Sequence, residues 1–546
     1  MATTEVLVLE ETLLKIGKWG KFQFFYYLCL GFVVMFSVFT MNYIFVARDI
    51  KYRCLIPECE IHNTQQFQPE FLKNVVPYRA GLPDKCLRYN YTLYVNKSDF
   101  QVNKKECQNR DTNETIKCNQ FVFERPKLTI VHEFNIFCID NLWKLTLVGT
   151  INVIGELINL SYTGFLSDRY GRNTIMSASV FLSALCGICK SFSQNYYTFI
   201  SFEFLDTALG GAMYGAAFVL AMELVTANDR DIANVIISCI YALGQVVLGA
   251  VAWLTPNWRV MVRSLYFPGL FSIFIWIFLP ESVRWLLSKR KHHEAIAVLS
   301  KIASVNGNRL SLEETQSLEN KWINMKHDGF EETNFCEQTK TKNESFWTVL
   351  KTPLLLARTI HCSLTWVCCT FVFYGLTIHS VEISKNIHLS FILGAIAETP
   401  GYVIYYYANA KSGRRKLMFA SLVSGGLFCL AVGFLPEGWL KLATFFGGKC
   451  SLTIAYTVLY VYTTELFPTS SRHAMFSICS MFGRIGSMVA PQIPLLANIS
   501  KTLPIFLFSA MSFMFGFLAL LLPETYNIHL PHTVEEAVTI GRKLEI

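Results

Sequence analysis

The stretch Met222-Glu-Leu-Val-Thr-Ala-Asn-Asp-Arg230 recurs 242 positions later as Thr464-Glu-Leu-Phe-Pro-Thr-Ser-Ser-Arg472. In both copies a Glu-Leu pair is followed by an arginine seven residues after the glutamate. Three further pairs have the same spacing to within one residue: Gly171-Arg172 with Gly413-Arg414, Gly244 with Gly486, and Pro280-Glu281 with Pro523-Glu524. Because these matches share one spacing, they indicate an internal duplication, and we expect two homologous halves.

The composition indicates a membrane protein. Of the 546 residues, 52% are hydrophobic and only 16% are charged, and the mean hydropathy is +0.35. Soluble proteins carry about 25% charged residues. The net charge of +8 is modest, and no basic surface with interleaved aromatic residues suggests nucleic-acid binding. We therefore expect a polytopic protein embedded in the lipid bilayer.

The apolar residues fall into twelve runs, most of about 20 residues, the length that crosses about 30 Å of hydrocarbon. These predict an all-α membrane protein with twelve transmembrane helices in two six-helix pseudo-repeats. The expected spans are 22–46, 142–166, 174–192, 196–222, 232–254, 260–279, 359–378, 389–407, 417–434, 440–463, 474–497 and 503–522. They define an N-terminal bundle (22–279), a central loop (280–355) and a C-terminal bundle (356–522), flanked by residues 1–21 and 523–546.

Basic residues in the short loops predict the orientation. Arg169 and Arg172 lie between spans 2 and 3, and four basic residues lie between residues 411 and 416, whereas the alternate loops contain one lysine, Lys501. Because positive charge marks the cytoplasmic side, we expect both termini and the central loop to be cytoplasmic.

The long loop between spans 1 and 2 (48–141) is then extracellular, and its residue types agree with that compartment. It contains six of the 17 cysteines: Cys54, Cys59, Cys86, Cys107, Cys118 and Cys138. It also contains three N-x-S/T sequons, at Asn90, Asn96 and Asn113. We predict up to three disulfides, for which fifteen connectivities are possible, and glycosylation at the sequons. The loop is also a candidate surface for association between copies of the chain.

Charged residues of the repeated motifs are candidate gating residues. They are Asp168, Arg169, Arg172, Glu223, Arg230, Glu281, Arg414, Glu465, Arg472 and Glu524. Salt bridges and helix-end contacts between the halves would close the cytoplasmic side and break when it opens. The alternative is that these charges anchor helix ends at the membrane interface.

Several motifs resemble those of a known family. The segment Gly164-Phe-Leu-Ser-Asp168-Arg169-Tyr-Gly171-Arg172-Asn173 resembles the loop 2–3 signature of the major facilitator superfamily. Pro280-Glu-Ser-Val-Arg284-Trp-Leu-Leu is similar to the Pro-Glu-Ser-x-Arg-Trp-Leu segment of the organic ion transporters. The other similar features are Ala242-Leu-Gly-Gln245, Tyr374-Gly-Leu, Thr464-Glu-Leu-Phe-Pro-Thr469 and the six-cysteine loop.

The chain is thereby identified as a member of the organic cation/anion/zwitterion transporter family, from the first span to about residue 525. The resemblance implies the major facilitator fold, with a substrate site near the midplane between halves that open alternately. Sugar porters share the gate motifs but lack the large ectodomain. The chain departs from the family at Ala410-Lys411-Ser-Gly413-Arg414, which lacks the acidic residue of the signature. It departs again at Glu203-Phe204-Leu205, where the family usually has Arg-Phe-Leu.

Charged residues at membrane depth are the first candidates for substrate contacts. Glu398 lies in Ala-Glu-Thr-Pro400-Gly, where proline would break the helix and free backbone carbonyls. The resemblance implies that this glutamate contacts cationic groups. Arg484 lies mid-span, where anion and zwitterion carriers of the family have arginine and cation carriers typically have aspartate. A guanidinium suits a carboxylate. The two charges could also pair with each other.

Further candidates are less specific. Tyr374, Tyr460 and Trp366 offer aromatic faces for quaternary ammonium groups, and Gln245 and Asn42 offer hydrogen bonds, although either kind of residue could simply pack between helices. Two other charged residues lie within spans. Glu203 is seven residues from the outer end of its span, whereas Glu156 is deeper and could be a proton or cation site; for both we favour helix-packing or interface roles.

Together these features predict a plasma-membrane carrier of small organic ions that works by alternating access. Carnitine-like zwitterions are the first expectation and organic anions the second; the alternatives are an organic cation transporter and a transporter-like receptor. No nucleotide-binding, metalloprotease or serine-nucleophile motif is present, so neither an enzyme nor a cofactor or metal site is expected. The sequence leaves open uniport, exchange, and sodium or proton coupling.

Overall fold

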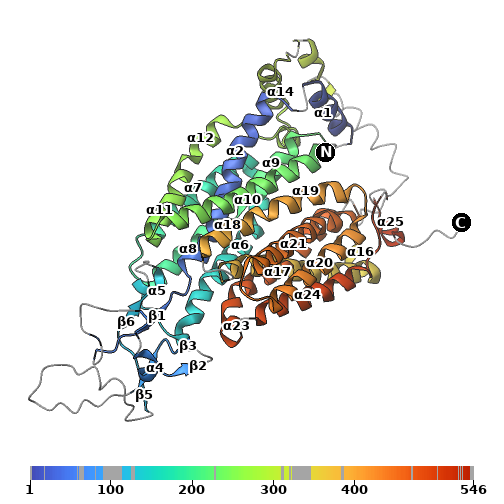
Figure 1. Cartoon of the computed structure of the whole chain (residues 1–546). Coiled ribbons are helices and arrows are strands. Elements are labelled where there is room, and N and C mark those ends of the chain that lie inside the picture. Colours follow the sequence, from blue (N-terminus) through green and yellow to red (C-terminus); the bar gives the residue numbers. More distant parts are fainter. Residues whose placement is uncertain are drawn as a thin grey trace, which may run out of the picture.

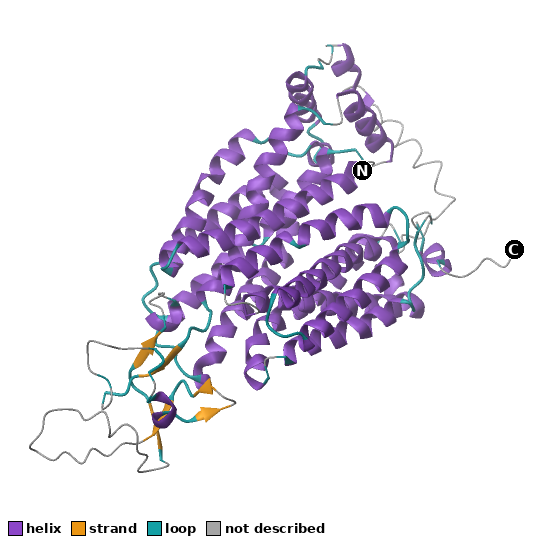
Figure 2. Cartoon of the chain, viewed as in Figure 1, coloured by secondary structure: helices purple, strands orange, loops and turns teal. Residues whose placement is uncertain are grey.

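The computed structural model describes residues 3–16, 19–57, 60, 67–69, 71–79, 82–89, 114–124, 129–226, 229–308, 311, 313–318, 321–322, 346–382, 386–468, 471–500, 502–526, 528, 531 and 533–540. Helices make up most of this part of the chain, and the strands are confined to one end of the molecule (Figure 2). The helices form two bundles, coloured blue to green and orange to red in Figure 1.

The helices of the N-terminal half begin after Gly20. They are α2 (Lys21–Val38), α3 (Tyr43–Val46), α6 (Leu142–Tyr170), α7 (Arg172–Lys190), α8 (Tyr196–Gly210), α9 (Ala212–Leu224), α10 (Arg230–Leu254), α11 (Trp258–Tyr266) and α12 (Ser272–Phe278), with 3-10 turns η1 (Phe39–Asn42) and η5 (Phe267–Phe271). Asparagine side chains cap two of them: Asn195 accepts from Thr198 N at 2.8 Å, and Asn257 accepts from Arg259 N at 2.9 Å. Such caps satisfy backbone donors that have no partner within the helix.

The C-terminal half repeats this plan. Its helices are α17 (Pro353–His379), α18 (Ile387–Ile396), α19 (Glu398–Asn409), α20 (Arg414–Phe434), α21 (Trp439–Glu465), α22 (Arg472–Val489), α23 (Ile493–Ile499) and α24 (Leu503–Ala519), with the 3-10 turn η7 (Ala490–Gln492) before α23. The helix containing Pro400 is interrupted at Ala397, because proline has no N–H to donate to the carbonyl of residue 396. The predicted break is therefore confirmed.

Ten helical segments of the described chain are long and apolar enough to cross a membrane, and they coincide with the first ten predicted spans. They are Lys21–Val46, Ile139–Tyr170, Arg172–Lys190, Tyr196–Leu224, Arg230–Leu254, Trp258–Phe278, Pro353–His379, Ile387–Asn409, Arg414–Phe434 and Trp439–Glu465. The eleventh predicted span falls on α22 and α23, and the twelfth on the shorter apolar helix α24. The all-α membrane architecture is confirmed, and the count of twelve stays a prediction.

The duplication is visible in helix packing. A Cβ added at Gly486 of α22 would lie 2.2 Å from the carbonyl oxygen of Val367 in α17, and one added at Gly244 of α10 would lie 3.0 Å from Cα of Met35 in α2. These repeated glycines therefore mark the same close contact in each half, between its fifth and first long helices.

Shorter helices lie outside the two bundles. They are α1 (Thr3–Ile16), α13 (Val283–Ser288), α14 (His292–Asn306), α16 (Phe346–Lys351) and α25 (Val534–Thr539). In Figure 1, α1 and α14 lie at the end of the molecule opposite the strands. Arg358 of α17 holds α25 by donating to the carbonyls of Ala537 and Ile540 at 2.6 and 2.8 Å.

The segment between α3 and α6 forms a small strand-containing domain. Its elements are β1 (Tyr52–Cys54) with β6 (Phe121–Phe123), β2 (Tyr78–Arg79) with β3 (Leu82–Pro83), β4 (Leu87–Tyr89) with β5 (Thr115–Lys117), and the helices α4 (Leu72–Val75) and α5 (Ile130–Glu133); each strand pair is antiparallel. Disulfides join Cys54 to Cys118 and Cys86 to Cys138. The remaining predicted cysteines and sequons lie outside the described residues: Cys59, Cys107, Asn90, Asn96 and Asn113.

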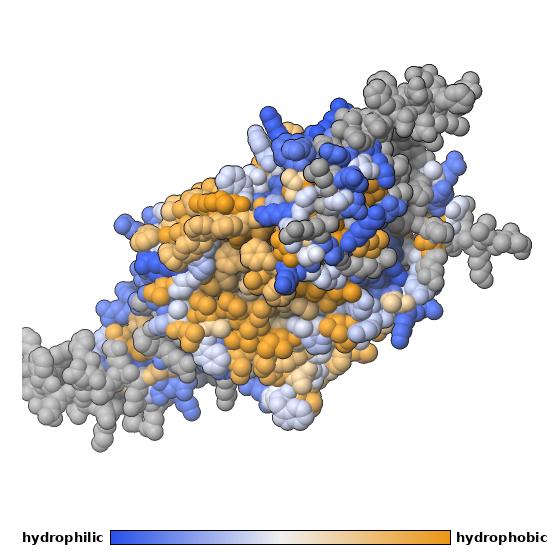
Figure 3. Space-filling view, turned by 90° about the horizontal axis from the view of Figure 1, so that it is seen from above, coloured by the Kyte–Doolittle hydropathy of each residue, from blue (hydrophilic) through white to orange (hydrophobic). Residues whose placement is uncertain are grey.

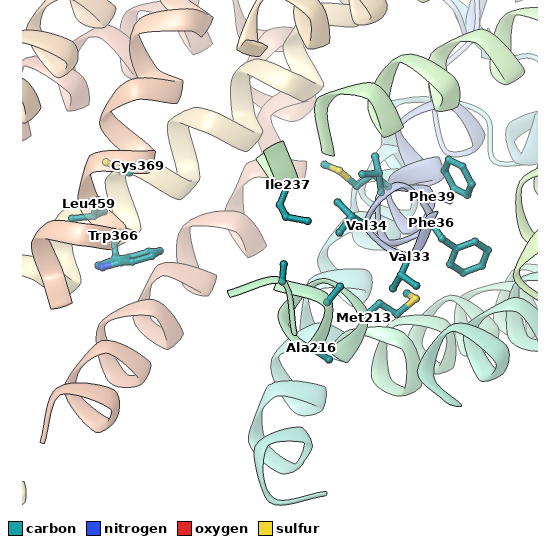
Figure 4. Packing of buried hydrophobic residues seen from close by; sticks show 14 of the residues in the cluster. Val33, Val34, Phe36, Phe39, Met213, Ala216, Ile237, Trp366, Cys369 and Leu459 are labelled. Atoms are coloured by element: carbon teal, nitrogen blue, oxygen red, sulfur yellow. The ribbon is translucent and has the colours of Figure 1, made fainter. Parts of the chain in front are cut away.

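One connected cluster of buried apolar residues extends through both halves. The labelled side chains of Figure 4 show part of it, with one group on α2, η1, α9 and α10 and another on α17 and α21. In the space-filling view, hydrophobic residues cover the middle of the molecule and hydrophilic residues gather toward its ends (Figure 3). This distribution fits a protein surrounded by lipid.

The halves meet along α6 and α10. Near the strand-containing domain, Thr146 and Thr150 of α6 hydrogen-bond Gln492 of η7 at 2.9 and 2.8 Å. Phe45 of α3 packs edge-on against Phe391 of α18, with ring centroids 5.0 Å apart. These contacts connect the two bundles at the end of the molecule that carries the strands.

Candidate functional site

The first copy of the repeated motif forms a compact charged cluster. Gly171 joins α6 to α7 with a φ of +107°, and a Cβ there would lie 2.3 Å from Glu281 Oε2. The Glu281 carboxylate accepts from the backbone N–H groups of Arg172 and Asn173 at 3.0 and 3.1 Å, as expected for an anion at a helix N-terminus. Arg172 Nε lies 3.2 Å from Glu223 Oε1, and Ser282 donates to the same carboxylate.

The second copy has the same geometry. Gly413 has a φ of +76°, and a Cβ there would lie 2.8 Å from Glu524 Oε2. Glu524 accepts from the backbone N–H of Arg414 at 2.8 Å, and the Arg414 guanidinium lies 3.1 Å from Glu465. Thr525 donates to Glu465 at 2.6 Å, as Ser282 does to Glu223.

These ion pairs lie within one half, whereas the expected gate needed contacts between halves. The remaining candidate gating residues lie beside them. Asp168 is 3.5 Å from Arg172, the Arg169 guanidinium stacks over Tyr170, and Arg472 interacts electrostatically with Glu465. The pairs therefore hold helix ends together inside each bundle.

The N-terminal helix adds a contact to this region. Glu10 of α1 lies 3.7 Å from both Arg230 and Arg284. Burial, together with neighbouring Arg230, lowers the pKa of Arg284 from its ordinary value. The Glu10 carboxylate offsets part of the repulsion between the two guanidinium groups.

Arg484 forms an ion pair across the halves. Its Nη1 lies 2.7 Å from Oε1 of Glu156 in α6, and the two side chains are 21% and 31% exposed. Opposite charges thus meet at the interface with part of each still accessible.

Tyrosines surround this pair. Tyr374, Tyr456 and Tyr460 all interact electrostatically with Arg484. The hydroxyls of Tyr456 and Tyr460 are 3.4 Å apart, and each of these rings lies edge-on to Trp366, whose centroid is 4.7 Å from that of Tyr460. Trp366 itself is buried and donates to Thr463 at 3.0 Å. Its fixed ring packs against both tyrosines and helps to hold them in place.

Glu398 has a different environment from Arg484. It is fully buried, and its carboxylate lies 3.0 Å from Nζ of Lys449, which is 2% exposed. Tyr402 donates to it at 3.4 Å, and Gln245 of α10 donates at 3.1 Å across the interface. Glu398 and Arg484 therefore pair with separate residues, not with each other.

Glu203 lies inside the N-terminal bundle and not at the membrane interface. It is fully buried and lies 2.7 Å from Nζ of Lys190, which is also 3.2 Å from Asp206. Asn42 donates to Tyr266 at 3.0 Å, and Tyr266 donates to Asp206. Asn42 therefore belongs to this buried cluster.

Sequence reasoning missed Lys190, Asp206 and Lys449. All three are charged residues within predicted spans, so the rule that singled out Glu398 and Arg484 applies to them too. A search for opposite charges among all intramembrane residues would have identified them.

Comparison with known proteins then assigns the chain to a family. The family model described as sugar (and other) transporter matches residues 89–536. The chain belongs to the sugar (and other) transporter family. Proteins of this family are transporters and not enzymes.

Individual relatives of this sugar (and other) transporter family member cover nearly its whole length. Solute carrier family 22 member 3 of Mus musculus is 28% identical over 97% of this chain and 96% of its own. The organic cation/carnitine transporter 2 of Homo sapiens is 27% identical over 97% of this chain and 94% of its own. These relatives confirm the resemblance to the organic ion transporters.

A solved structure shows the fold of this family member. The xylose transporter XylE of E. coli, in an inward-open conformation, aligns with a TM-score of 0.59 and 16% identity over 76% of this chain and 94% of that one. The predicted major facilitator fold is therefore confirmed, and the protein is a multi-pass membrane transporter.

Proposed function

We propose that this transporter carries small organic ions and that carnitine-like zwitterions are its preferred substrates. The observation that carries the proposal is the Arg484–Glu156 pair, which presents one charge of each sign at the interface between the halves. A zwitterion would place its carboxylate on Arg484 and its ammonium group beside Glu156.

The accessibility of the pair favours exchange with a substrate. An ion pair that keeps part of its surface accessible can exchange one partner for a substrate group without leaving a charge uncompensated. Breaking a buried pair costs about 3–5 kcal/mol when one charge is left uncompensated. The first case describes Arg484 and Glu156, and the second describes Glu398 and Lys449.

The tyrosines beside Arg484 offer aromatic faces to the quaternary ammonium group of such a substrate. Tyr374 and Tyr460 are half-buried and lie beside Arg484. An aromatic face contributes about 0.5–2 kcal/mol to binding a cation that has lost its water. A quaternary ammonium group beside Glu156 would therefore gain from both the carboxylate and the rings.

Glu398 and Gln245 would contribute by joining the halves. Lys449 neutralises Glu398, so this carboxylate offers no free charge to a cation in the present conformation. The Gln245–Glu398 hydrogen bond crosses the interface and would rearrange as the halves move. The repeated Arg–Glu pairs would keep each bundle rigid during that movement.

An organic anion is the second candidate, with Arg484 as its partner and Glu156 displaced. An organic cation is the third, by analogy with the names of the relatives. We further propose a plasma-membrane location with both termini cytoplasmic and the sequon-bearing loop outside. A receptor would not need the two-half arrangement, so it is the weakest alternative.

Uptake into proteoliposomes tests the proposal. Radiolabelled carnitine, tetramethylammonium and benzoate would be compared with and without a sodium gradient, in the wild type, Arg484→Gln and the exposed charge control Lys301→Gln. We expect carnitine uptake in the wild type and in the control, with loss of carnitine and benzoate uptake in Arg484→Gln. Carnitine uptake that is equal in all three proteins would contradict the proposal.

A further inference from the structure

A second group of charges lies wholly inside the N-terminal bundle, away from the Arg484–Glu156 pair. Lys190 of α7 lies 2.7 Å from Glu203 and 3.2 Å from Asp206, both on α8, and all three side chains have no solvent exposure. With every group ionised, this cluster carries two negative charges and one positive charge. An uncompensated buried charge is costly, and proteins usually neutralise it.

The groups packed around the cluster supply no second cation among the described residues. From α7, Cys186 interacts electrostatically with Asp206, and from α3, Tyr43 interacts with Glu203. From α6 comes the neutral amide of Asn152, and from α11 the hydroxyl of Tyr266. A proton on one carboxyl group would bring the cluster to neutrality.

Hydrogen bonding distinguishes the two carboxyl groups. Both oxygens of Glu203 face groups that can only donate, because Oε2 faces Lys190 Nζ and Oε1 accepts from Asn152 Nδ2 at 2.8 Å. A protonated Glu203 would turn its own hydrogen toward a donor. Asp206 Oδ2 also faces Lys190 Nζ, at 3.2 Å, but it faces the Tyr266 hydroxyl as well, and Oδ1 accepts from the Ser183 hydroxyl at 2.5 Å. A hydroxyl can donate or accept, so Asp206 has two neighbours that could accept from its protonated form.

The surroundings of Tyr266 allow its hydrogen bond with Asp206 to reverse, so that the Tyr266 hydroxyl accepts instead of donating. Its hydroxyl lies 3.4 Å from the carbonyl oxygen of Phe39, to which it can donate when it accepts from Asp206. Asn42 Nδ2 donates to the same hydroxyl at 3.0 Å. The Asn42 Oδ1 atom is fully buried and makes no hydrogen bond within the described structure, so the amide that binds the Tyr266 hydroxyl also carries an unpaired acceptor.

We propose that Asp206 is a proton-binding site whose proton is exchanged with solvent during transport. The proton moves from water to Asp206 Oδ2, and the Tyr266 hydroxyl rotates from Asp206 to Phe39. Each of the four carboxylate oxygens already has a hydrogen-bond donor, so a metal ion would have to displace Lys190. A proton therefore fits this site better than sodium.

The cluster has a physical connection to the proposed substrate site, and its coupling to transport rests on that proposed function. Asn152, which binds Glu203, lies four residues before Glu156 on α6, so both face the same side of that helix. Asn152 also donates to the carbonyl of Thr40 at 3.0 Å and thus ties α6 to η1. A proton at Asp206 can therefore influence the position of the helix that carries Glu156.

Infrared difference spectroscopy of the purified full-length protein in lipid tests the proton site directly. Raising the pH should remove a C=O stretch of a protonated carboxyl group in the wild type, and Asp206→Asn should lack this band. Glu156→Gln, which removes a carboxylate outside the cluster, should retain it. Absence of the band in the wild type, or its persistence in Asp206→Asn, would overturn the proposal.

A second variant covers the case in which Asp206→Asn fails to fold. Tyr266→Phe keeps both carboxyl groups but removes the hydroxyl that would accept a hydrogen bond from protonated Asp206. The C=O band should therefore shift in frequency. An unshifted band would contradict the assignment. Exchanging potassium for sodium at constant pH should leave the wild-type band unchanged, and its loss would indicate a sodium site instead.

Uptake under an imposed pH gradient tests the exchange of the proton during transport. An inward proton gradient should change the initial rate of carnitine uptake at least twofold in the wild type and have no effect in Asp206→Asn. An equal response of both proteins would overturn the coupling. Equilibrium carnitine binding, measured separately, distinguishes a wrong substrate from a wrong proton site, because the infrared band does not depend on the substrate.

Discussion

Arg484 of α22 and Glu156 of α6 form a 2.7 Å ion pair that joins the two halves of the transporter. The repeated pairs Arg172–Glu223 and Arg414–Glu465 each stay within one half. The interface pair is partly exposed, whereas the pairs of the duplicated motifs connect elements inside one bundle.

Glu156→Gln should alter substrate preference without abolishing transport of anions. The variant removes the negative partner of a quaternary ammonium group and leaves Arg484 available for a carboxylate. We expect the KM for tetramethylammonium and carnitine to rise about 10-fold, equivalent to about 1.4 kcal/mol, while benzoate uptake persists. Initial rates of uptake measure this, with exposed Glu437→Gln as the matched control. Equal losses for all three substrates would argue against a separate role for Glu156.

Removing one member of the Glu398–Lys449 pair should destabilise the protein. Both side chains are buried, so Lys449→Met leaves the Glu398 carboxylate without its counterion, at a cost of about 3–5 kcal/mol. The double variant Glu398→Gln/Lys449→Met should recover much of that loss. Thermal unfolding in detergent compares the three proteins. A double variant less stable than Lys449→Met would show that the pair is not the source of the effect.

Alanine at either duplicated loop glycine should be costly. Gly171 and Gly413 have positive φ angles, and a side chain at either position would approach the carboxylate of Glu281 or Glu524. We expect each substitution to lower stability by about 1–3 kcal/mol from backbone strain alone, because only glycine readily adopts this positive-φ, extended-ψ conformation. Gly164→Ala is the control, because a Cβ there meets nothing within 4 Å. The melting temperature should fall in the first two variants only.

The charged pairs of the repeated motif should couple within a half. A double-mutant cycle of Arg172→Gln with Glu223→Gln should give a coupling energy of at least about 0.5 kcal/mol in thermal unfolding. The cycle of Arg172→Gln with Glu465→Gln should be additive in the present conformation, because each charge has its own partner. Additivity of Arg172→Gln with Glu223→Gln, together with coupling of Arg172→Gln to Glu465→Gln, would instead favour the gate between halves that the sequence predicted.

Much of the fold follows from local sequence features. The helix break before Pro400 needs no tertiary information, because the missing N–H lies in the same helix. Likewise, Gly171 and Gly413 occupy equivalent turns because the motif around them is repeated. Ten of the predicted spans follow from the length of their apolar runs.

The partners of the site residues could not be predicted in the same way. Helical periodicity says which residues share a face but not which face of another helix lies opposite. The sequence offered Arg484 as a possible partner of Glu398, whereas the structure pairs Glu398 with Lys449. Glu156 and Arg484 come from different halves, so only the packing of α6 against α22 brings them together.

Equilibrium binding of radiolabelled carnitine to the purified transporter tests the central claim most directly, because it depends on neither driving force nor transport direction. We predict that Arg484→Gln weakens binding at least about tenfold, since a charge-assisted hydrogen bond to a carboxylate contributes about 1.5–3 kcal/mol. The exposed control Lys301→Gln should bind as the wild type does. Wild-type affinity in Arg484→Gln would contradict the assignment of the Arg484–Glu156 pair as the substrate site.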